Sequence, residues 1–570
     1  MQDLSPLRSA GLMAVILFLS LGVNVIGVSW GLPETWCDDE NLTAREAVHM
    51  FQNRNLCPAA YYYGTLPKYA MLLYFAPYLV CTKAHGLKSN PLEDLPGVYY
   101  FLGRIFIALI AALAAVLFYR FLLKICSSPI AFSTALMLAL SPVYVYSAHL
   151  IKNTAFLVLL FLLIALLSAQ FIISGKRKFL YLASLVCGMN VAVQITGVFA
   201  AFLVLVPTVS YLLGKLDPKP GPKAFKETAG IFVREGIAFG LGLGLTYPCA
   251  LLHPTRAFYQ VYVVLSAIKS GEGIIYPLGL VRFPKILFQD SGYIGVSLAL
   301  LGLILYLWKF RKNLPEASRK VVNYLVLPAA VIFYLCYTSK SRLEPNYLIP
   351  YLPFYLVFAA IFLDQLYRSR AGKKAALAIM VLSLAWLGGL ALWIDYGFLN
   401  DTRYQARAWL EKNIPSGSRI ETTTGLFKLS SQYDAYLIDW SYYTPLPPRQ
   451  LVLLVRKLEN KILAQSVDLS LSDYDRYEKE WQAKLDDYLH RFSMSGLKER
   501  NPDYIIASSR LYNRYLNYPN RYPSTKKYWE ELLAGKYNYQ IIKRFDRPPL
   551  IGLTGNSLCP EIVILKRVRE

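Results

Sequence analysis

The sequence lacks the short motifs that mark the common soluble enzyme and nucleic-acid-binding classes. Its hydrophilic C-terminal part has no G-x-G-x-x-G loop, no P-loop and no H-E-x-x-H helix. The eight cysteines show no metal-site spacing. The net charge is +23, yet no nucleic-acid reader motif is visible. These absences argue against a dinucleotide-binding enzyme, a zinc protease and a nucleic-acid-binding protein.

A cleavable signal peptide is also not indicated. The first apolar run, near residues 11–30, is too long for the apolar core of a signal peptide, and no clean cleavage site follows it. We therefore expect this run to be a retained transmembrane helix.

Hydrophobic residues, in contrast, make up 55% of the chain. They come in repeated runs of about 18–22 residues, the length a helix needs to cross the ~30 Å hydrocarbon core of a membrane. The runs predict a polytopic α-helical membrane protein with about eleven transmembrane helices. We place these helices at residues 9–30, 98–121, 130–148, 155–174, 179–194, 196–213, 229–252, 293–308, 321–337, 347–366 and 375–396.

The long loop 31–97 contains one more apolar stretch, residues 69–81, which is either a short span or an interfacial helix. The distribution of basic residues favours the interfacial interpretation, because every basic cluster between spans then falls on one face, which we take as cytoplasmic. These clusters are Arg120 and Lys124; Lys176, Arg177 and Lys178; Lys215, Lys219, Lys223 and Lys226; Lys309, Arg311, Lys312, Arg319 and Lys320; and Arg368, Arg370, Lys373 and Lys374. The N-terminus is then cytoplasmic in a multi-pass protein of the plasma or inner membrane.

Hydropathy falls after Tyr396. We expect a transmembrane domain over residues 1–396 and a soluble, extracytoplasmic α/β domain over 397–570. Strand-like runs occupy residues 418–423, 504–507, 539–543 and 562–565, and a charged helix-like stretch occupies 472–492.

The cysteines divide by environment. Cys37 and Cys57 share the loop 31–97, where they are either free or joined in a disulfide. Five other cysteines lie in or beside apolar runs, and we interpret them as small buried residues: Cys81, Cys126, Cys187, Cys249 and Cys336.

Three consecutive acids, Asp38, Asp39 and Glu40, directly follow the first helix. Adjacent carboxylates suit two tasks, the coordination of a hard divalent cation and the acceptance of a proton from a substrate hydroxyl. The alternative is structural: Asp38 or Asp39 caps a helical stretch at residues 41–53.

Basic and aromatic residues gather on the same predicted face as these acids. Lys68, after a tyrosine run that ends at Tyr63, either reaches a phosphate or belongs to an interfacial anchor. His149 and Lys152 lie in a short polar turn, where long side chains also snorkel. The turn 339–347 carries Lys340, Arg342 and Tyr347. Cations on an outer face depart from the positive-inside trend, and either an anionic ligand or interfacial anchoring explains them.

In this order, the motifs resemble the membrane-embedded GT-C glycosyltransferases, in particular the protein O-mannosyltransferase-like and aminoarabinose-transferase-like enzymes. Four features carry the resemblance, which covers about 400 residues. They are the pair Asp39-Glu40, the segment Tyr-Gly-Thr-Leu-Pro at 63–67, Gly103-Arg104 in the second helix, and Ser141-Pro142 ahead of the polar turn.

The resemblance implies transfer of a sugar from a polyprenyl-phosphate donor to a glycan, lipid or protein acceptor on the non-cytoplasmic face. Asp39 would be the base or metal-organising acid, with Glu40 beside it. A divalent metal is common in the family but not universal. Lys68, Lys340 and Arg342 would hold the phosphate, and further candidates for substrate binding are Tyr63, Arg104, His149, Lys152 and Tyr347.

The chain departs from the family at two positions. It has Asn153 where the family often has an acid, and Gln194 where it often has a lysine. The first departure puts a bridging metal in doubt and leaves a non-catalytic glycolipid-binding relative as one alternative. A transporter or lipid flippase is another, although the sequence shows no clear internal repeat and no charges deep inside its spans.

Overall fold

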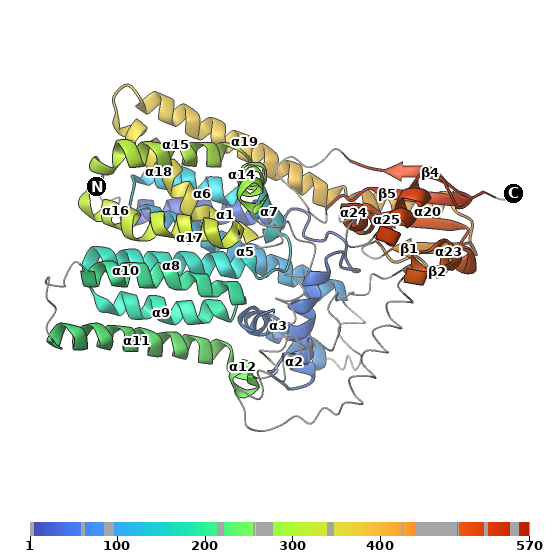
Figure 1. Ribbon diagram of the computed structural model, residues 1–570, viewed down its shortest axis with the longest axis horizontal. Helices are drawn as coiled ribbons and strands as arrows, with labels where there is room; N and C mark the ends of the chain where they lie inside the picture. Colours follow the sequence, from blue (N-terminus) through green and yellow to red (C-terminus); the bar gives the residue numbers. More distant parts are fainter. Residues whose placement is uncertain are drawn as a thin grey trace.

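The computed structural model describes residues 5–58, 63–84, 96–213, 222–254, 257, 278–338, 347–423, 426–438, 487, 489–517, 523–547 and 558–568. Long apolar helices run side by side in a bundle, and a small sheet with its own helices lies at one end (Figure 1). Within these described residues, seven helices are long and apolar enough to cross a membrane, or eight if a bent pair counts as one span. The protein is therefore a mostly helical integral membrane protein.

Each of the eleven predicted spans has a helical counterpart in the bundle. Several counterparts are short or interrupted, so the number of spans stays a prediction. The bundle consists of α1 (Pro6–Val25), α5 (Pro96–Leu122), α6 (Ser128–Ala139), α7 (Pro142–Ala148), α8 (Thr154–Ser174), α9 (Arg177–Val191), α10 (Phe202–Leu213), α11 (Pro222–Thr246), α12 (Pro248–Leu252), α15 (Ile294–Trp308), α16 (Glu316–Val321), α17 (Leu327–Thr338), α18 (Leu352–Arg368) and α19 (Lys373–Leu399). Short turns of helix, η2 (Ile195–Ala201), η3 (Phe310–Lys312) and η4 (Val322–Val326), link some of them.

Proline interrupts two of the predicted spans. α6 and α7 meet at an angle of 60° at Ser141-Pro142, and α11 ends before Pro248, which opens α12. Proline has no backbone N–H to donate and its ring clashes with the preceding turn, but it is well tolerated at the first position of a new helix. The two breaks turn the chain at the end of the bundle where the sheet lies, which we call the sheet end.

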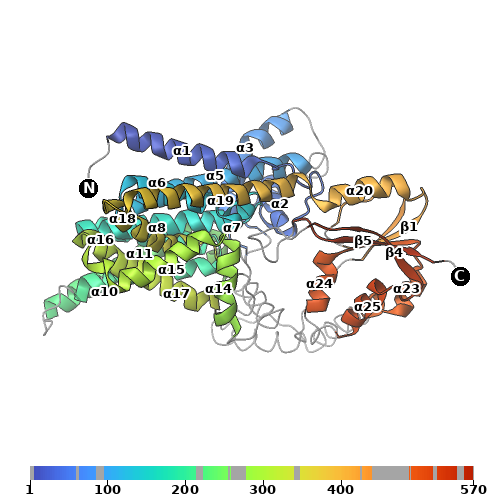
Figure 2. The same ribbon diagram turned by 90° about the horizontal axis from the view of Figure 1, so that it is seen from above.

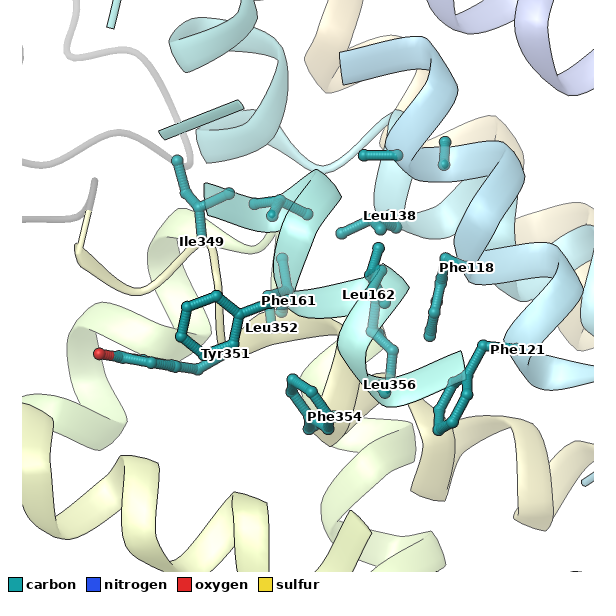
Figure 3. Close-up of a cluster of buried hydrophobic side chains, with 14 of the residues drawn as sticks. Phe118, Phe121, Leu138, Phe161, Leu162, Ile349, Tyr351, Leu352, Phe354 and Leu356 are labelled. Carbon is teal, nitrogen blue, oxygen red and sulfur yellow. The ribbon is translucent and has the colours of Figure 1, made fainter. Parts of the chain in front are cut away.

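The bundle interior is filled by interlocking apolar side chains. Phe118 and Phe121 of α5, Leu138 of α6 and Phe161 of α8 pack in one buried cluster with residues of α18 (Figure 3). Elsewhere small residues let helices approach closely. A Cβ at Gly188 would overlap the backbone of α11, and one at Gly242 would overlap the backbone of α9. Such close backbone packing is typical of helix pairs in membranes.

Further helices lie at the sheet end of the bundle (Figure 1). They are η1 (Asp38–Leu42), α2 (Ala44–Gln52), α3 (Leu66–Ala84) and α14 (Leu278–Asp290). Figure 1 shows α3 nearly end-on while the bundle helices run across the view, so α3 crosses the direction of the bundle. This orientation favours an interfacial position for the stretch 69–81. The membrane topology itself stays a prediction.

The described part of the C-terminal region contains a mixed five-stranded sheet of order β2-β1-β3-β5-β4. Its strands are β1 (Arg419–Thr423), β2 (Asp434–Ile438), β3 (Tyr504–Ser508), β4 (Tyr539–Phe545) and β5 (Ile562–Arg567). β1 pairs in parallel with β2 and β3, whereas β5 pairs antiparallel with β3 and β4. Four strands match the predicted runs, and β2 was not predicted. The predicted helix at 472–492 lies largely outside the described residues.

Helices cover both faces of this sheet (Figure 2). α20 (Thr402–Asn413) lies on one face, and α24 (Ser509–Asn517) and α25 (Pro523–Leu533) lie on the other, with α23 (Met494–Arg500) nearby. Alternate residues of β3 follow this division: Tyr504 and Ile506 join the core under α20, whereas Ile505 and Ala507 join the core under α24 and α25.

The core under α20 continues into the bundle through Trp30, Trp36 and Phe398. The Arg403 guanidinium lies over both tryptophan rings, 4.9 Å from the centroid of Trp30 and 4.3 Å from that of Trp36. Asp401 accepts hydrogen bonds from Arg403 Nε at 2.8 Å and from Trp30 Nε1 at 3.0 Å. We call the loop that carries Asp38, Asp39 and Glu40 the acidic loop. These contacts fix the start of this loop against the C-terminal region.

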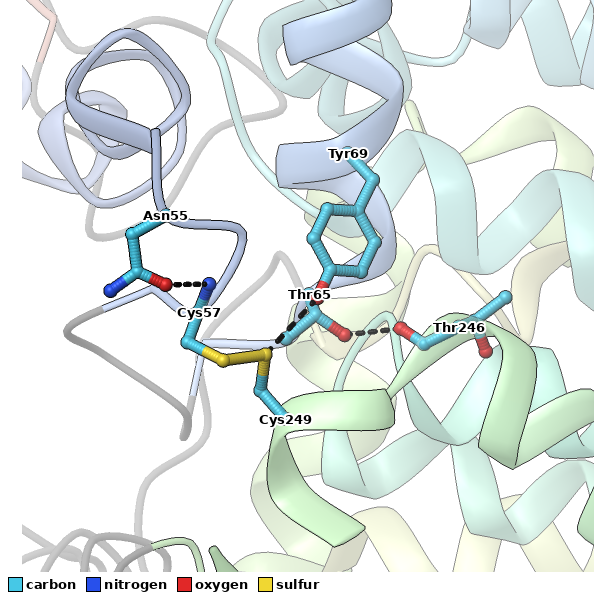
Figure 4. The surroundings of a disulfide bond; sticks show 6 residues. All are labelled: Asn55, Cys57, Thr65, Tyr69, Thr246 and Cys249. Atoms are coloured by element: carbon cyan, nitrogen blue, oxygen red, sulfur yellow. Dashed lines mark hydrogen bonds between the residues drawn. A yellow bond between two sulfur atoms is a disulfide. The ribbon is translucent and has the colours of Figure 1, made fainter. Parts of the chain in front are cut away.

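A disulfide joins Cys57 to Cys249 (Figure 4). The suggested Cys37–Cys57 pairing is therefore wrong, and Cys37 is a buried free thiol. The error has a clear origin, since the apolar run continues through residue 252 and places Cys249 inside a predicted span. The break at Pro248 instead turns Cys249 toward the loop before α3. Thr65 strengthens the same junction by donating to the Thr246 carbonyl.

Candidate functional site

Asp39 and Lys152 form an ion pair at the sheet end of the bundle. Lys152 Nζ lies 3.1 Å from Asp39 Oδ2, and the lysine side chain is 12% exposed against 48% for the aspartate. Asp39 belongs to η1, while Lys152 lies in the turn between α7 and α8. Capping of the next helix does not explain Asp39, because the residue at the N-cap of α2 is Thr43. The structure thus brings together two residues that the sequence singled out.

The Lys152 ammonium is held in its charged form. Burial alone would lower the pKa of Lys152, but the Asp39 carboxylate raises that pKa well above its usual value. A positive charge is therefore fixed beside a half-exposed carboxylate. Such an arrangement suits an anion that arrives from the exposed side.

Tyr63 lies in the same electrostatic environment. Burial and the Asp39 carboxylate raise the pKa of its hydroxyl well above the usual value, and Tyr347 is also within electrostatic range. The hydroxyl of Tyr63 therefore keeps its proton at neutral pH. The predicted site residue Tyr63 thus lies near Asp39 and Lys152.

The backbone around Tyr63 explains the Tyr-Gly-Thr segment. Gly64 has a φ of +67°, and a Cβ there would overlap the carbonyl of Val193. The Thr65 N–H donates to the Ala192 carbonyl at 2.8 Å. The segment is therefore clamped to the end of α9, which holds Tyr63 beside the ion pair.

The sequence did not identify two neighbours of the ion pair, Cys37 and Tyr146. Burial raises the pKa of the Cys37 thiol to about 11, despite the opposing effect of Lys152, so this thiol stays protonated. Tyr146 is buried on α7 and lies within electrostatic range of Lys152. Cys37 directly precedes the acid run, so proximity in sequence was a usable signal for it. No sequence signal pointed to Tyr146.

Glu40 has a different environment from its neighbour Asp39. Both of its oxygens accept from Arg104, at 2.8 Å from Nε and 2.7 Å from Nη2, and Oε1 also accepts from the Ile151 N–H at 3.0 Å. Arg104 further donates to the carbonyls of Val28 and Trp30. Glu40 and Arg104 are both fully enclosed. Their geometry favours a role in positioning the acidic loop. It does not favour the catalytic role expected for Glu40 or the substrate-binding role expected for Arg104 from the sequence.

His149 and Lys68 are also enclosed. The two ring nitrogens of His149 lie 2.8 Å from the Val145 carbonyl and 2.7 Å from the Ile26 carbonyl, and Nε2 lies 3.3 Å from Asp395. Lys68 is completely buried, 4.0 Å from Glu46. Burial lowers the pKa of Lys68 to about 8, although Glu46 opposes this shift. The remaining phosphate candidates, Lys340 and Arg342, lie outside the described residues.

A divalent metal at Asp39 is common in the family but not universal, and the donor set around this residue does not fit one. Within the described part of the chain, no group of three His, Cys, Asp or Glu side chains could hold a metal ion. Asn153 stands where the family often has an acid. Its Nδ2 donates to the carbonyls of Tyr63 at 2.8 Å and Val193 at 2.9 Å. The Lys152 ammonium already neutralises Asp39.

No protein-family model and no curated protein matches the chain. Several solved structures are similar to the chain. ArnT from Cupriavidus metallidurans bound to undecaprenyl phosphate is similar over 99% of this chain and 98% of its own, with 12% identity and a TM-score of 0.47. The archaeal oligosaccharyltransferase AglB from Archaeoglobus fulgidus, in complex with an inhibitory peptide and a dolichol-phosphate, is similar over 90% of this chain and 72% of its own, with 12% identity and a TM-score of 0.47.

The arabinofuranosyltransferase AftD from Mycobacteria is similar over 100% of this chain and 40% of its own, with 13% identity and a TM-score of 0.44. The activity has to be argued from this chain's own residues.

Proposed function

We propose that the protein is a GT-C-type glycosyltransferase that moves a sugar from a polyprenyl-phosphate donor to an acceptor hydroxyl. The observation that carries the proposal is the half-exposed Asp39 carboxylate paired at 3.1 Å with the Lys152 ammonium. A base and a fixed cation in one place are what transfer from a phosphate leaving group requires. The donor carrier would belong to the class of undecaprenyl phosphate or dolichol phosphate.

The proposed reaction is a displacement at the anomeric carbon of the sugar. The acceptor oxygen bonds to this carbon while its proton passes to Asp39. The bond from the carbon to the phosphate oxygen breaks, and its electron pair stays with the phosphate. The leaving group thereby changes from a phosphodiester to a phosphomonoester and gains negative charge. Lys152 would stabilise this charge, and Asp39 would later release the proton to water.

Other residues near Asp39 would position it. The buried pair of Glu40 with Arg104 fixes the loop that carries Asp39 and, through the Ile151 N–H, the turn that carries Lys152. Lys68 is enclosed against Glu46, so we assign the contact with the leaving phosphate to Lys152. Tyr63 and Tyr347 would line the approach to the sugar.

The site would face the non-cytoplasmic side, together with the C-terminal region 397–570. The Cys57–Cys249 disulfide supports this orientation, because disulfides persist in oxidising compartments. The helix that carries Cys249, α12, lies toward the sheet end of the bundle, whereas α16 lies at the opposite end (Figure 1). The basic clusters predicted as cytoplasmic include Arg319 and Lys320 of α16.

The experiment that tests the donor class is a panel of radiolabelled polyprenyl-phosphate sugars incubated with the purified protein. Release of polyprenyl phosphate from one donor would support the proposal and identify the sugar. No release from any donor, together with substrate movement across proteoliposomes, would instead favour a transporter. Binding of the donors without release or movement would favour a non-catalytic glycolipid-binding protein.

A further inference from the structure

We propose that Lys152 is the fixed positive charge of this site and that transfer proceeds without a divalent metal ion. The inference rests on the proposed function and deepens it. It assigns to a side chain of the protein the charge stabilisation that a bound cation would otherwise supply.

The first observation is the way Asn153 is used. The side chain is 3% exposed, and its Nδ2 donates to two backbone carbonyls, those of Tyr63 and Val193. An amide nitrogen carries two hydrogens, so both are committed. A carboxylate in this place would direct lone pairs at two carbonyl oxygens and leave both carbonyls without a donor. The surroundings therefore suit the amide nitrogen and do not suit a second metal-binding acid, while the Asn153 Oδ1 has no hydrogen-bond partner among the described residues.

The second observation is the competition for Asp39. Its Oδ2 lies 3.1 Å from Lys152 Nζ, and the lysine is nearly enclosed. A divalent ion on the same carboxylate would lie within a few ångströms of this ammonium and be repelled by it. Displacing the ammonium would leave a nearly buried positive charge without its partner, which is strongly unfavourable. The Asp39 carboxylate thus already has a resident cation, the Lys152 ammonium.

The third observation concerns what the ammonium can still reach. An ammonium carries three N–H bonds, and among the described residues Asp39 is the ion-pair partner of Lys152. The remaining N–H bonds can donate to an oxygen of the leaving phosphate while the ion pair stays intact. The same charge would then hold the base in place and stabilise the leaving group as the glycosidic bond breaks.

A purely structural role for Lys152, anchoring the acidic loop to the turn after α7, predicts different behaviour. Lys152→Met would then lower stability and would affect catalysis only through the folded fraction. The catalytic role predicts a loss of kcat in protein that remains folded, by about 10²–10³-fold, the range seen when one charge-stabilising donor is removed. Lys152→Arg keeps the charge and should retain part of the rate. Lys176→Met, an exposed lysine after α8, is the matched control and should leave kcat unchanged.

The deciding experiment combines metal analysis with turnover of the full-length protein. Elemental analysis of the purified protein should find well below one equivalent of bound zinc, manganese or magnesium. Turnover of the best donor should change less than about twofold after EDTA treatment or addition of each metal ion. Asn153→Asp should melt at a lower temperature than wild type and should not become metal-dependent.

Several results would overturn the inference. They are a stoichiometric metal ion, loss of turnover in EDTA with recovery on adding a metal, full kcat in Lys152→Met, or an Asn153→Asp variant that is as stable as wild type and gains metal dependence. Metal content is measured without activity, so a stoichiometric ion overturns the inference even in inactive protein. Metal-free protein that turns over no donor under any condition overturns the proposed function and, with it, the catalytic role of Lys152.

Discussion

We assign Glu40 to positioning the acidic loop and Asp39 to the chemistry. Substitutions of these two adjacent acids should therefore have different effects on stability and activity. Glu40→Ala would remove the partner of a fully buried arginine. Breaking a buried ion pair by removing one partner typically costs about 3–5 kcal/mol, because an uncompensated charge remains inside. Glu40 also accepts from the Ile151 N–H, and Arg104 keeps only the Val28 and Trp30 carbonyls. We therefore expect a loss in the free energy of unfolding of about 3–5 kcal/mol.

Asp39→Ala should cost less stability than Glu40→Ala. The Asp39 carboxylate is 48% exposed, whereas Glu40 and Arg104 are both fully buried. Its removal still leaves the nearly enclosed Lys152 ammonium without its partner, so we expect a loss of stability smaller than that of Glu40→Ala, and no transfer by the protein that stays folded. The two variants therefore separate folding from chemistry at neighbouring positions in the sequence.

The measurement is unfolding by SDS titration in mixed micelles, combined with donor turnover per folded molecule. A double-mutant cycle with Arg104→Ala should give a favourable coupling energy of about 1–3 kcal/mol between Glu40 and Arg104, since each single variant leaves the other group unpaired. A Glu40→Ala protein that unfolds like wild type yet transfers no sugar would refute the reasoning and return Glu40 to the catalytic group.

Three further predictions concern stability. Lys68 is protonated in both folded and unfolded protein below about pH 8, and between pH 8 and its usual pKa of 10.5 the unfolded state binds more protons. Wild type should therefore gain up to about 3 kcal/mol relative to Lys68→Met over this range, as measured by unfolding at each pH, and a constant difference would contradict the burial effect. Replacing Cys57 and Cys249 by serine should lower stability by up to about 5 kcal/mol on the chain-entropy estimate, while Cys37→Ser should leave the disulfide intact in a non-reducing peptide map. Arg403→Ala should release the C-terminal region from the acidic loop and increase its cleavage in limited proteolysis, and unchanged cleavage would argue against that contact.

Hydropathy predicted the bundle well because a membrane span is a property of about twenty consecutive residues. The helix ends were less predictable where proline intervened, at Pro142 and Pro248, since apolar composition continues through both breaks. The edge strand β2, Asp434–Ile438, was missed because its apolar run, Ala-Tyr-Leu-Ile, is too short to distinguish a strand from a helix by periodicity.

The sequence allowed a prediction of which residues belong to the site, but not of which side chains pair with one another. The sequence singled out Asp39, Lys152 and Tyr63, which the fold brings together. It did not show that Glu40 pairs with Arg104, because that contact depends on how α5 packs against the acidic loop. Cys249 was assigned to a span for the same reason, since only the three-dimensional path after Pro248 takes it to Cys57.

The central claim is that Asp39 is the base of a sugar transfer from a polyprenyl-phosphate donor. The most direct measurement is release of polyprenyl phosphate by wild type, Asp39→Asn and the control Asp434→Asn, which changes an exposed acid of the sheet. The account predicts release by wild type and the control, and none by folded Asp39→Asn. Full release by Asp39→Asn would contradict it.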